Sequence, residues 1–200
     1  MRAKQRLSYR VVALAAVEIR MKIMNLANDD KLLLQVAELL IDGFKETASW
    51  NTLDSALEEV HQSFGENRIS RVAMDENENV LGWIGGIEEY VGNVWELHPL
   101  VIRRDYRKKG IGRALVGDFE RQVKIRNGTT IHLGTDDENN RTSLGGIDLY
   151  PNVVDHLLDI KNLREHPFEF YQKLGFVITG VVPDANGFGK PDIFMAKRVL

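Results

Sequence analysis

The chain has 200 residues, of which 44% are hydrophobic and 28% charged, and a formal net charge of −3 at pH 7. This length and apolar content suffice for one compact domain with a substantial core. The slightly acidic balance excludes a dedicated nucleic-acid-binding protein, whose surface is basic, and favours a small cationic partner. Cysteine is absent, which excludes disulfides and cysteine-ligated zinc and is compatible with a cytoplasmic location. The five histidines are scattered without ligand spacing, so we expect no metal.

Residues 1–20 differ in pattern from the rest of the chain. Arg2, Lys4 and Arg6 precede an apolar run over residues 11–17, which loosely resembles a signal peptide. A membrane span needs about 20 apolar residues, so we expect no membrane insertion. We interpret residues 1–20 as an N-terminal extension outside the core, or as a product of start-codon choice with Met21 as the functional start. Residues 21–200 are expected to form a single domain.

The first half of the remaining chain shows periodic apolar segments separated by caps and turns. Asn28 is the expected cap of the first helix, and Thr52 with the capping-box pattern at residues 55–58 marks the start of the second. Acidic and amide residues at 76–79 suit a hairpin turn. The expected elements, in chain order, are a strand over 22–26, a helix over 29–44, a helix from 52 to about 65, and strands over 69–74, 80–90 and 94–103.

The second half alternates between helix and strand patterns. The expected elements are a helix over 114–126, a strand over 129–134, a long polar loop with a short helix over 135–163, a helix over 167–174, and strands over 176–182 and 193–199. This order predicts a mixed α/β fold, in which a sheet with antiparallel early strands is flanked by helices.

A basic glycine turn stands between the strand that ends near residue 103 and the following helix. It reads Arg107-Lys108-Lys109-Gly110-Ile111-Gly112-Arg113. The two glycines leave room for a ligand to approach the first unpaired N–H groups of the helix, where the helix dipole and the basic side chains favour phosphate. The known phosphate-loop patterns G-x-x-x-x-G-K-[ST] and G-x-G-x-x-G are absent at this turn. The remaining R-x-x-G-x-G pattern predicts a site for a pyrophosphate-bearing cofactor.

This turn in its context of strand, helix and strand, followed by Phe170-Tyr171-Gln172-Lys173-Leu174-Gly175-Phe176, resembles the GNAT superfamily of acyl-CoA-dependent N-acyltransferases over residues 21–200. Further segments are similar to the chromosomal aminoglycoside 6′-N-acetyltransferases: residues 95–100, 133–137, 166–171 and 183–192. The resemblance implies a mostly antiparallel central sheet with a parallel central pair. It also implies acetyl-CoA as donor, the 6′-amine of an aminoglycoside as acceptor, direct attack in a ternary complex, and a homodimer, for which pairing through the C-terminal strand is a hypothesis.

The resemblance further implies roles for individual residues. The amides of residues 108–113 would hold the pyrophosphate, and the pantetheine arm would lie along Leu100 and Ile102. The N–H of Leu100 would stabilise the oxyanion, an interaction worth about 3 kcal/mol. Tyr171 would protonate or bind the departing thiolate, although a core aromatic residue is the alternative. His98-Pro99 predicts a local break in strand pairing, because proline cannot donate to the ladder.

Glu96 and His98 lie two residues apart in a predicted strand, so their side chains share one face of the sheet. A carboxylate beside an imidazole can hold an ammonium group and relay its proton, directly or through water. We therefore expect Glu96 to be the base or amine anchor and His98 its partner. A structural role for the histidine is the alternative.

An acidic cluster, Asp136-Asp137-Glu138, follows a predicted strand. Carboxylates there would attract and orient a polycation, and Asp136 and Asp137 are the expected ligands; a solvated charge run is the alternative. Trp50 either flanks a sugar ring of the acceptor or packs as a buried indole.

Two other functions stay open at this point. The acceptor could instead be a polyamine or a lysine-bearing peptide, with the same chemistry. Alternatively, the chain could be a non-catalytic module that binds CoA as a sensor. Kinetic comparison of amine acceptors separates the first alternative, and CoA binding without turnover would indicate the second.

Overall fold

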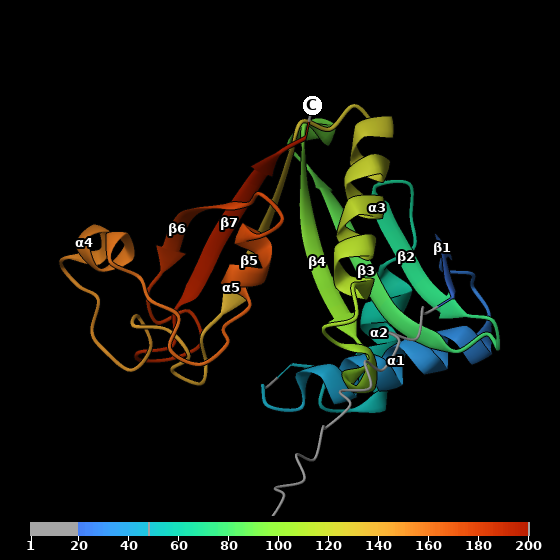
Figure 1. Ribbon diagram of the computed structural model, residues 1–200, viewed down its shortest axis with the longest axis horizontal. Helices are drawn as coiled ribbons and strands as arrows, with labels where there is room; N and C mark the ends of the chain where they lie inside the picture. Colours follow the sequence, from blue (N-terminus) through green and yellow to red (C-terminus); the bar gives the residue numbers. More distant parts are fainter. Residues whose placement is uncertain (1–19, 48, 200) are drawn as a thin grey trace, which may run out of the picture.

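The computed structural model describes residues 20–47 and 49–199. Apart from Arg20, the extension expected over residues 1–20 lies outside the described residues. Figure 1 shows the arrangement of the elements. In chain order they are β1 (Met21–Asn25), α1 (Asp30–Phe44), α2 (Leu53–Gln62), β2 (Arg68–Asp75), β3 (Val80–Glu89), η1 (Tyr90–Gly92), β4 (Val94–Ile102), η2 (Arg104–Tyr106), α3 (Ile111–Ile125), β5 (Thr130–Asp136), α4 (Val153–Leu158), α5 (Phe168–Gln172), β6 (Val177–Val182) and β7 (Asp192–Arg198).

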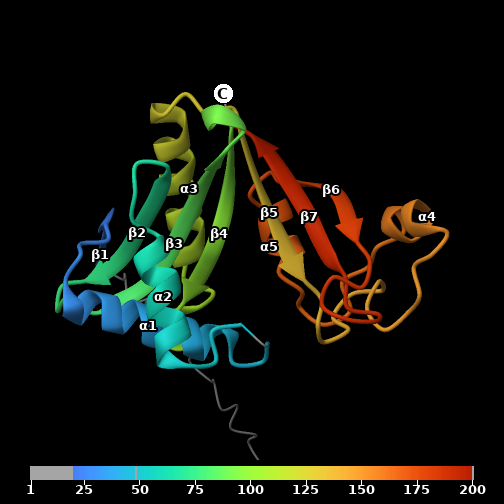
Figure 2. The same cartoon turned by 180° about the vertical axis from the view of Figure 1, so that it is seen from behind.

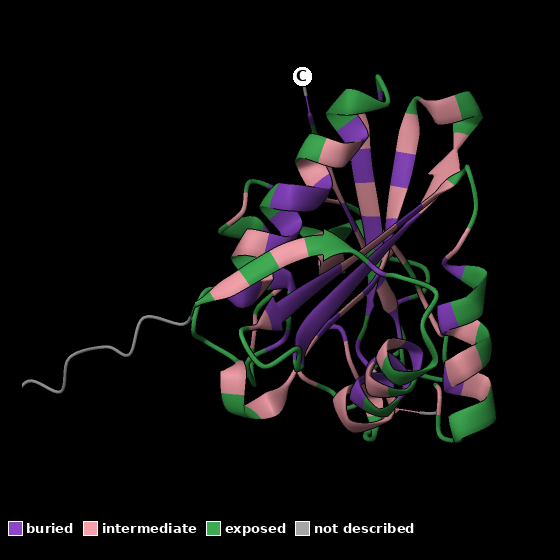
Figure 3. Cartoon of the chain, turned by 90° about the vertical axis from the view of Figure 1, so that its right-hand side faces the viewer, coloured by how far each residue is buried: buried purple, intermediate pink, exposed green. Residues whose placement is uncertain are grey.

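The seven strands form one sheet in the order β1-β2-β3-β4-β5-β7-β6. All neighbouring pairs are antiparallel except β4 and β5, which pair in parallel. The predicted mixed α/β fold, mostly antiparallel with a parallel central pair, is therefore confirmed. Helices α1 and α2 cover one face of the N-terminal strands and α3 covers the other (Figures 1 and 2). Figure 3 shows that buried positions concentrate on the central strands and on the inner sides of the helices.

The helix starts follow local capping chemistry. Helix α1 is capped by Asp29, whose carboxylate accepts a 3.1 Å hydrogen bond from the Leu32 amide. The expectation of Asn28 was therefore wrong by one residue. Helix α2 starts at Thr52 as predicted. The capping box joins Thr52 to Ser55, however, and not Ser55 to Glu58 as the pattern at residues 55–58 suggested. Helix α3 starts three residues earlier than predicted, so that Gly110 of the glycine turn becomes its N-cap.

The predicted break in β4 is confirmed. The register between β3 and β4 shifts at His98–Pro99, opposite Gly85. Before the break, Trp95 packs into the core cluster beneath α3, whereas after it Val101 packs into the cluster beneath α1 and α2. Residues with odd numbers thus change faces at the break. A side chain at position 85 would collide with the His98 carbonyl, so the close approach of the two strands requires glycine there.

Strands β4 and β5 pair over only three residues each. Val94–Glu96 pairs with Thr130–His132; beyond that point β4 stays with β3, and β5 stays with β7. The two halves of the sheet therefore diverge, as Figure 2 shows. The gap between the diverging strands can be reached from both faces of the sheet, and the candidate site lies at this gap.

Candidate active site

The edge of β4 that faces β5 carries main-chain donors beyond the divergence. The Arg103 amide donates to the Leu81 carbonyl on β3 at 2.9 Å. Because amide direction alternates along an antiparallel strand, the N–H groups of Leu100 and Ile102 point to the opposite edge. The pairing between β4 and β5 has already ended there. These two amides are the positions from which the sequence predicts pantetheine binding.

The glycine turn presents amides at the start of α3. Gly110 has a φ of +90°, and a Cβ added there would meet nothing within 4 Å. The left-handed backbone, rather than crowding, is therefore the reason for glycine. Ala114 is the first amide to close a turn, on the Gly110 carbonyl at 3.0 Å. The amides of residues 111–113 consequently lack a carbonyl one helical turn behind them, and this anion-binding geometry fits a diphosphate.

The basic side chains of the turn differ in their surroundings. Arg107 donates from Nε to the Ile102 carbonyl at 3.2 Å, so it is held against the end of β4. Burial and the nearby charge of Arg104 lower the pKa of Arg107. Lys108 instead pairs with exposed Glu165 at 2.9 Å, and the Lys109 ammonium lies 4.9 Å from the centre of the Tyr106 ring. Of these three, Arg107 is the residue whose side chain the strand orients.

Three carboxylates lie on the face of the sheet opposite α3: Glu96 on β4, Asp136 on β5 and Asp192 on β7. Asp136 on β5 stands opposite Asp192 on β7 in the antiparallel register. A Cβ added to Gly134 would lie 2.5 Å from an Asp192 oxygen, so the carboxylate rests over the glycine backbone. Burial, then the charges of Asp136 and Glu96, raise the pKa of Asp192 to about 6. A face of this kind attracts cations.

Asp137 does not belong to this group. Its side chain is fully buried, and its oxygens accept hydrogen bonds from the Arg141 and Thr142 amides and from the Thr142 hydroxyl. The expectation that Asp137 binds the acceptor is therefore wrong. Its carboxylate is used to fold the loop that follows β5, because a buried anion needs several donors.

His98 lies beside Trp50 and Glu59, on the face of the sheet covered by α2. The centres of the indole and imidazole rings are 5.6 Å apart, and the Glu59 carboxylate lies 3.8 Å from the imidazole Nε2. Because Trp95 and Leu97 face the cluster beneath α3, Glu96 shares the face of His98, as the spacing predicts. Trp50 is half-buried and packs edge-on against Phe44.

Tyr171 lies on α5, among the core residues of the opposite face. Its ring packs edge-on against Phe170 and Phe176. Burial raises the pKa of Tyr171 far above its usual value, so its hydroxyl is protonated at neutral pH and can donate a hydrogen bond. Buried His166 precedes α5 and hydrogen bonds through Nε2 to the Asp136 carbonyl at 3.1 Å. Burial lowers the pKa of His166, and the neutral ring ties α5 to the end of β5.

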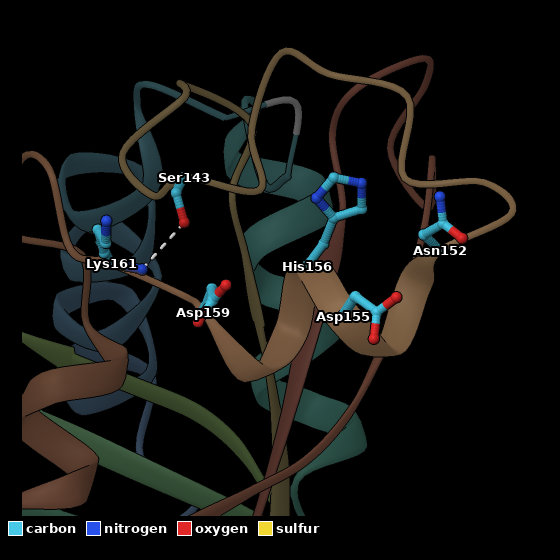
Figure 4. A pocket seen from close by; sticks show the side chains of 6 residues that line it. All are labelled: Ser143, Asn152, Asp155, His156, Asp159 and Lys161. Atoms are coloured by element: carbon cyan, nitrogen blue, oxygen red, sulfur yellow. Dashed lines mark hydrogen bonds between the residues drawn. The ribbon is translucent and has the colours of Figure 1, made fainter.

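A hollow of about 440 Å³ lies elsewhere, beside α4. Figure 4 shows its lining, in which the Ser143 hydroxyl accepts a hydrogen bond from the Lys161 amide. The hollow is lined by Ser143, Asn152, Asp155, His156, Asp159 and Lys161. These side chains carry mixed charges, and none of them is a site residue predicted from the sequence. Within the described ranges, no group of three or more His, Asp and Glu residues is arranged to hold a metal ion. No helix in the same part of the chain has the length and apolar character needed to cross a membrane.

Sequence reasoning missed three residues of this region. Glu59 and Asp192 reach the site only through tertiary packing and strand register, neither of which a local pattern reveals. The only sequence signal for Asp192 is that the segment over residues 183–192 resembles the acetyltransferases. Gly134 lies within β5, where no turn calls for a glycine, and its close contact with the Asp192 carboxylate explains the residue type.

Comparison with known proteins gives the family. The model of the acetyltransferase (GNAT) family matches residues 33–150. A comparison with curated proteins finds no significant match. Among solved structures, an aminoglycoside 6′-N-acetyltransferase complexed with coenzyme A is 42% identical, with a TM-score of 0.82, over 91% of this chain and 98% of the other. The aminoglycoside 6′-N-acetyltransferase from Enterococcus faecium is 43% identical, with a TM-score of 0.81, over 90% and 97%.

A third structure, aminoglycoside 6′-acetyltransferase type Ii, is 37% identical and has a TM-score of 0.68, over 90% of this chain and 97% of that one. The similarity thus extends over nearly the full length of each of these proteins. Together with the fold and the glycine turn, these matches show that the chain belongs to the GNAT family of acetyltransferases.

Proposed function

We propose that this acetyltransferase moves the acetyl group of acetyl-CoA to the 6′-amine of an aminoglycoside. The observation that carries the proposal is the divergence of β4 and β5. The amides proposed to bind acetyl-CoA lie on one side of this gap, at the start of α3 and on the open edge of β4. The carboxylates proposed to bind the acceptor lie on the opposite face of the sheet, beside the same gap. The names of the similar enzymes support both the donor and the acceptor.

The donor site consists of the turn and the open strand edge. The amides of Lys108, Lys109, Gly110, Ile111, Gly112 and Arg113 hold the pyrophosphate, and Arg107 adds charge. The amides of Leu100 and Ile102 bind the pantetheine arm, because its amide groups need main-chain partners. Acetyl-CoA supplies the activated thioester carbonyl.

The reaction is a direct attack of the amine on that carbonyl. Glu96 accepts the proton of the substrate ammonium, directly or through water, with His98 as its partner. The new C–N bond forms while the Leu100 amide stabilises the developing oxyanion. As the C–S bond breaks, Tyr171 donates a hydrogen bond to the thiolate. The raised pKa of Tyr171 favours binding of the sulfur over full transfer of the phenol proton.

The acceptor site is the acidic face. Glu96, Asp136 and Asp192 attract an aminoglycoside, because several ammonium groups on one molecule gain from several carboxylates. Trp50 lies beside His98 and offers a flat apolar surface to a sugar ring. We further propose that the enzyme is a cytoplasmic homodimer, which light scattering tests. The expected pairing through the C-terminal strand is wrong, because β7 lies between β5 and β6 and already has a neighbour on each side. The edge strand on this side of the sheet is β6, and we propose that it lies near the interface.

Thiol-release kinetics test the activity. Acetyl-CoA is supplied with kanamycin, spermidine or polylysine, and kcat/KM is compared. We expect kanamycin to be the best acceptor, and Glu96→Gln and Tyr171→Phe to lower its kcat. A better rate with spermidine or polylysine would contradict the acceptor, and tight CoA binding without turnover of any amine would favour the sensor alternative.

A further inference from the structure

Glu59 on α2 uses its two carboxylate oxygens on two different segments of the chain. Oε2 accepts a 3.3 Å hydrogen bond from the indole Nε1 of Trp50 in the loop between α1 and α2. Oε1 lies 3.8 Å from Nε2 of His98, at the break in β4. One side chain thus connects the α1–α2 loop with the strand that carries the proposed catalytic groups.

The surroundings hold this carboxylate in place. Only 21% of the Glu59 side chain is exposed, against 40% for His98. Its helix is anchored by Ala56 and Val60, which are fully buried in the core beneath α1 and α2. Glu59 therefore approaches His98 from a rigid element, which is the geometry that preorganises a functional side chain.

The chemistry of the imidazole gives the contact a consequence. Of the two neutral tautomers of an imidazole, a carboxylate opposite Nε2 favours the one with its hydrogen on Nε2. The lone pair then remains on Nδ1, which can accept a hydrogen bond from water or from an amine. The same carboxylate fixes the indole of Trp50, whose ring borders the imidazole.

We propose that Glu59 is a positioning residue for the amine acceptor: it sets the orientation and tautomer of His98 and holds Trp50 beside it. This inference rests on the proposed function, because it assigns His98 and Trp50 to the acceptor side of the reaction. It predicts an effect on acceptor kinetics with little effect on acetyl-CoA.

The first experiment compares Glu59→Gln with Glu58→Gln. Glutamine at position 59 keeps an oxygen acceptor for the Trp50 indole and removes the charge that faces His98. Glu58 is the exposed neighbour on the same helix and hydrogen bonds to Gln62, so its variant controls for the charge change. For Glu59→Gln we expect kcat/KM for kanamycin to fall about tenfold, with the KM for acetyl-CoA and the melting temperature close to wild type.

A double-mutant cycle then tests whether Glu59 acts through His98. In a His98→Gln background, Glu59→Gln should cost little more, because the group that it orients is gone. Equal costs in both backgrounds would overturn the proposal, as would an unchanged kcat/KM for Glu59→Gln in the wild-type background.

NMR of the imidazole nitrogens provides a readout that needs no acceptor. The His98 signals are assigned by their loss in His98→Gln. In the wild type and in Glu58→Gln, we expect the nitrogen signals of the His98 imidazole to be those of the tautomer with hydrogen on Nε2. In Glu59→Gln we expect these signals to change, and identical spectra in all three proteins would contradict the proposal. If the wild type acetylates no amine, the proposed function fails, while the NMR comparison still decides whether Glu59 controls His98.

Discussion

Asp136 and Asp192 stand opposite each other on β5 and β7, and the charge of Asp136 adds to burial in raising the pKa of Asp192 to about 6. Two like charges that face each other across neighbouring strands oppose folding and at the same time favour a bound cation. We therefore expect the acidic face to lower the stability of the fold while it favours binding of the proposed cationic acceptor.

The first prediction concerns pH and Asp192→Asn. Because the folded pKa of Asp192 is raised to about 6, the native state binds more protons than the unfolded state between about pH 4 and pH 6. The contribution of Asp192 to the free energy of unfolding therefore falls as pH rises through this window and is constant above it. We expect the free energy of unfolding, measured with urea at pH 4, 5, 6 and 7, to depend less on pH in Asp192→Asn than in the wild type. Asp155→Asn, at an exposed position, should show the pH dependence of the wild type.

The same titration affects acceptor binding. Asp192 gains its negative charge as pH rises through about 6, so the KM for kanamycin should drop across this range in the wild type. The drop should be smaller in Asp192→Asn. Identical pH profiles of KM in the two proteins would remove Asp192 from the acceptor site.

The second prediction compares two glycines, Gly110 at the N-cap of α3 and Gly117 within the helix. Gly110 has a φ of +90°, whereas Gly117 is an exposed helical residue, and a Cβ at either position meets nothing within 4 Å. Gly110→Ala should therefore raise the KM for acetyl-CoA about fivefold and destabilise the fold by about 1 kcal/mol, through backbone strain alone. Gly117→Ala should stabilise the protein by about 1 kcal/mol. Thermal melting and acetyl-CoA kinetics check both, and an unchanged KM in Gly110→Ala would contradict the proposed phosphate site.

The third prediction concerns the loop after β5. Asp137→Asn weakens three hydrogen bonds to Arg141 and Thr142 in a fully buried place and introduces a donor among donors. We expect a loss of about 3 kcal/mol in unfolding free energy and faster proteolysis within residues 138–164. Glu138→Gln removes the same charge from the next residue and should leave both measurements near the wild type. Equal behaviour of the two variants would show that Asp137 does not organise the loop.

The fourth prediction separates chemistry from folding at Tyr171. Tyr171→Phe keeps the ring that packs against Phe170 and Phe176 and removes only the hydroxyl, the proposed hydrogen-bond donor to the thiolate. The kcat should fall about tenfold to a hundredfold, with unchanged KM for the acceptor and a melting temperature near wild type. Tyr150→Phe, at an exposed residue, serves as the control. An unaltered kcat would return Tyr171 to a purely structural role.

Local chemistry explains why much of this fold was predictable. The capping box at Thr52, the turn at Gly110 and the break at His98–Pro99 each depend on a few adjacent residues. The same holds for the shared face of Glu96 and His98, since alternation in a strand is a local rule.

Residues that depend on distant partners were not predictable in this way. Asp137 looked like its neighbour Asp136, and only the fold of the following loop shows that its carboxylate is enclosed. The pairing of Asp192 with Asp136 depends on strand register. Glu59 carries no local pattern, because its partners come from a loop and from a strand.

The register shift at His98–Pro99 gives a single strand two separate duties. Upstream of it, the side chains of Glu96 and His98 extend from one face of the sheet; downstream, the Leu100 amide points to the open edge of β4 that faces β5. Removing one residue at this point would turn either the proposed proton acceptor, Glu96, or the proposed oxyanion-binding amide of Leu100 away from the reacting atoms. Homologues that differ in amine preference should therefore tolerate changes in the surrounding helices far more readily than a change in the length of β4.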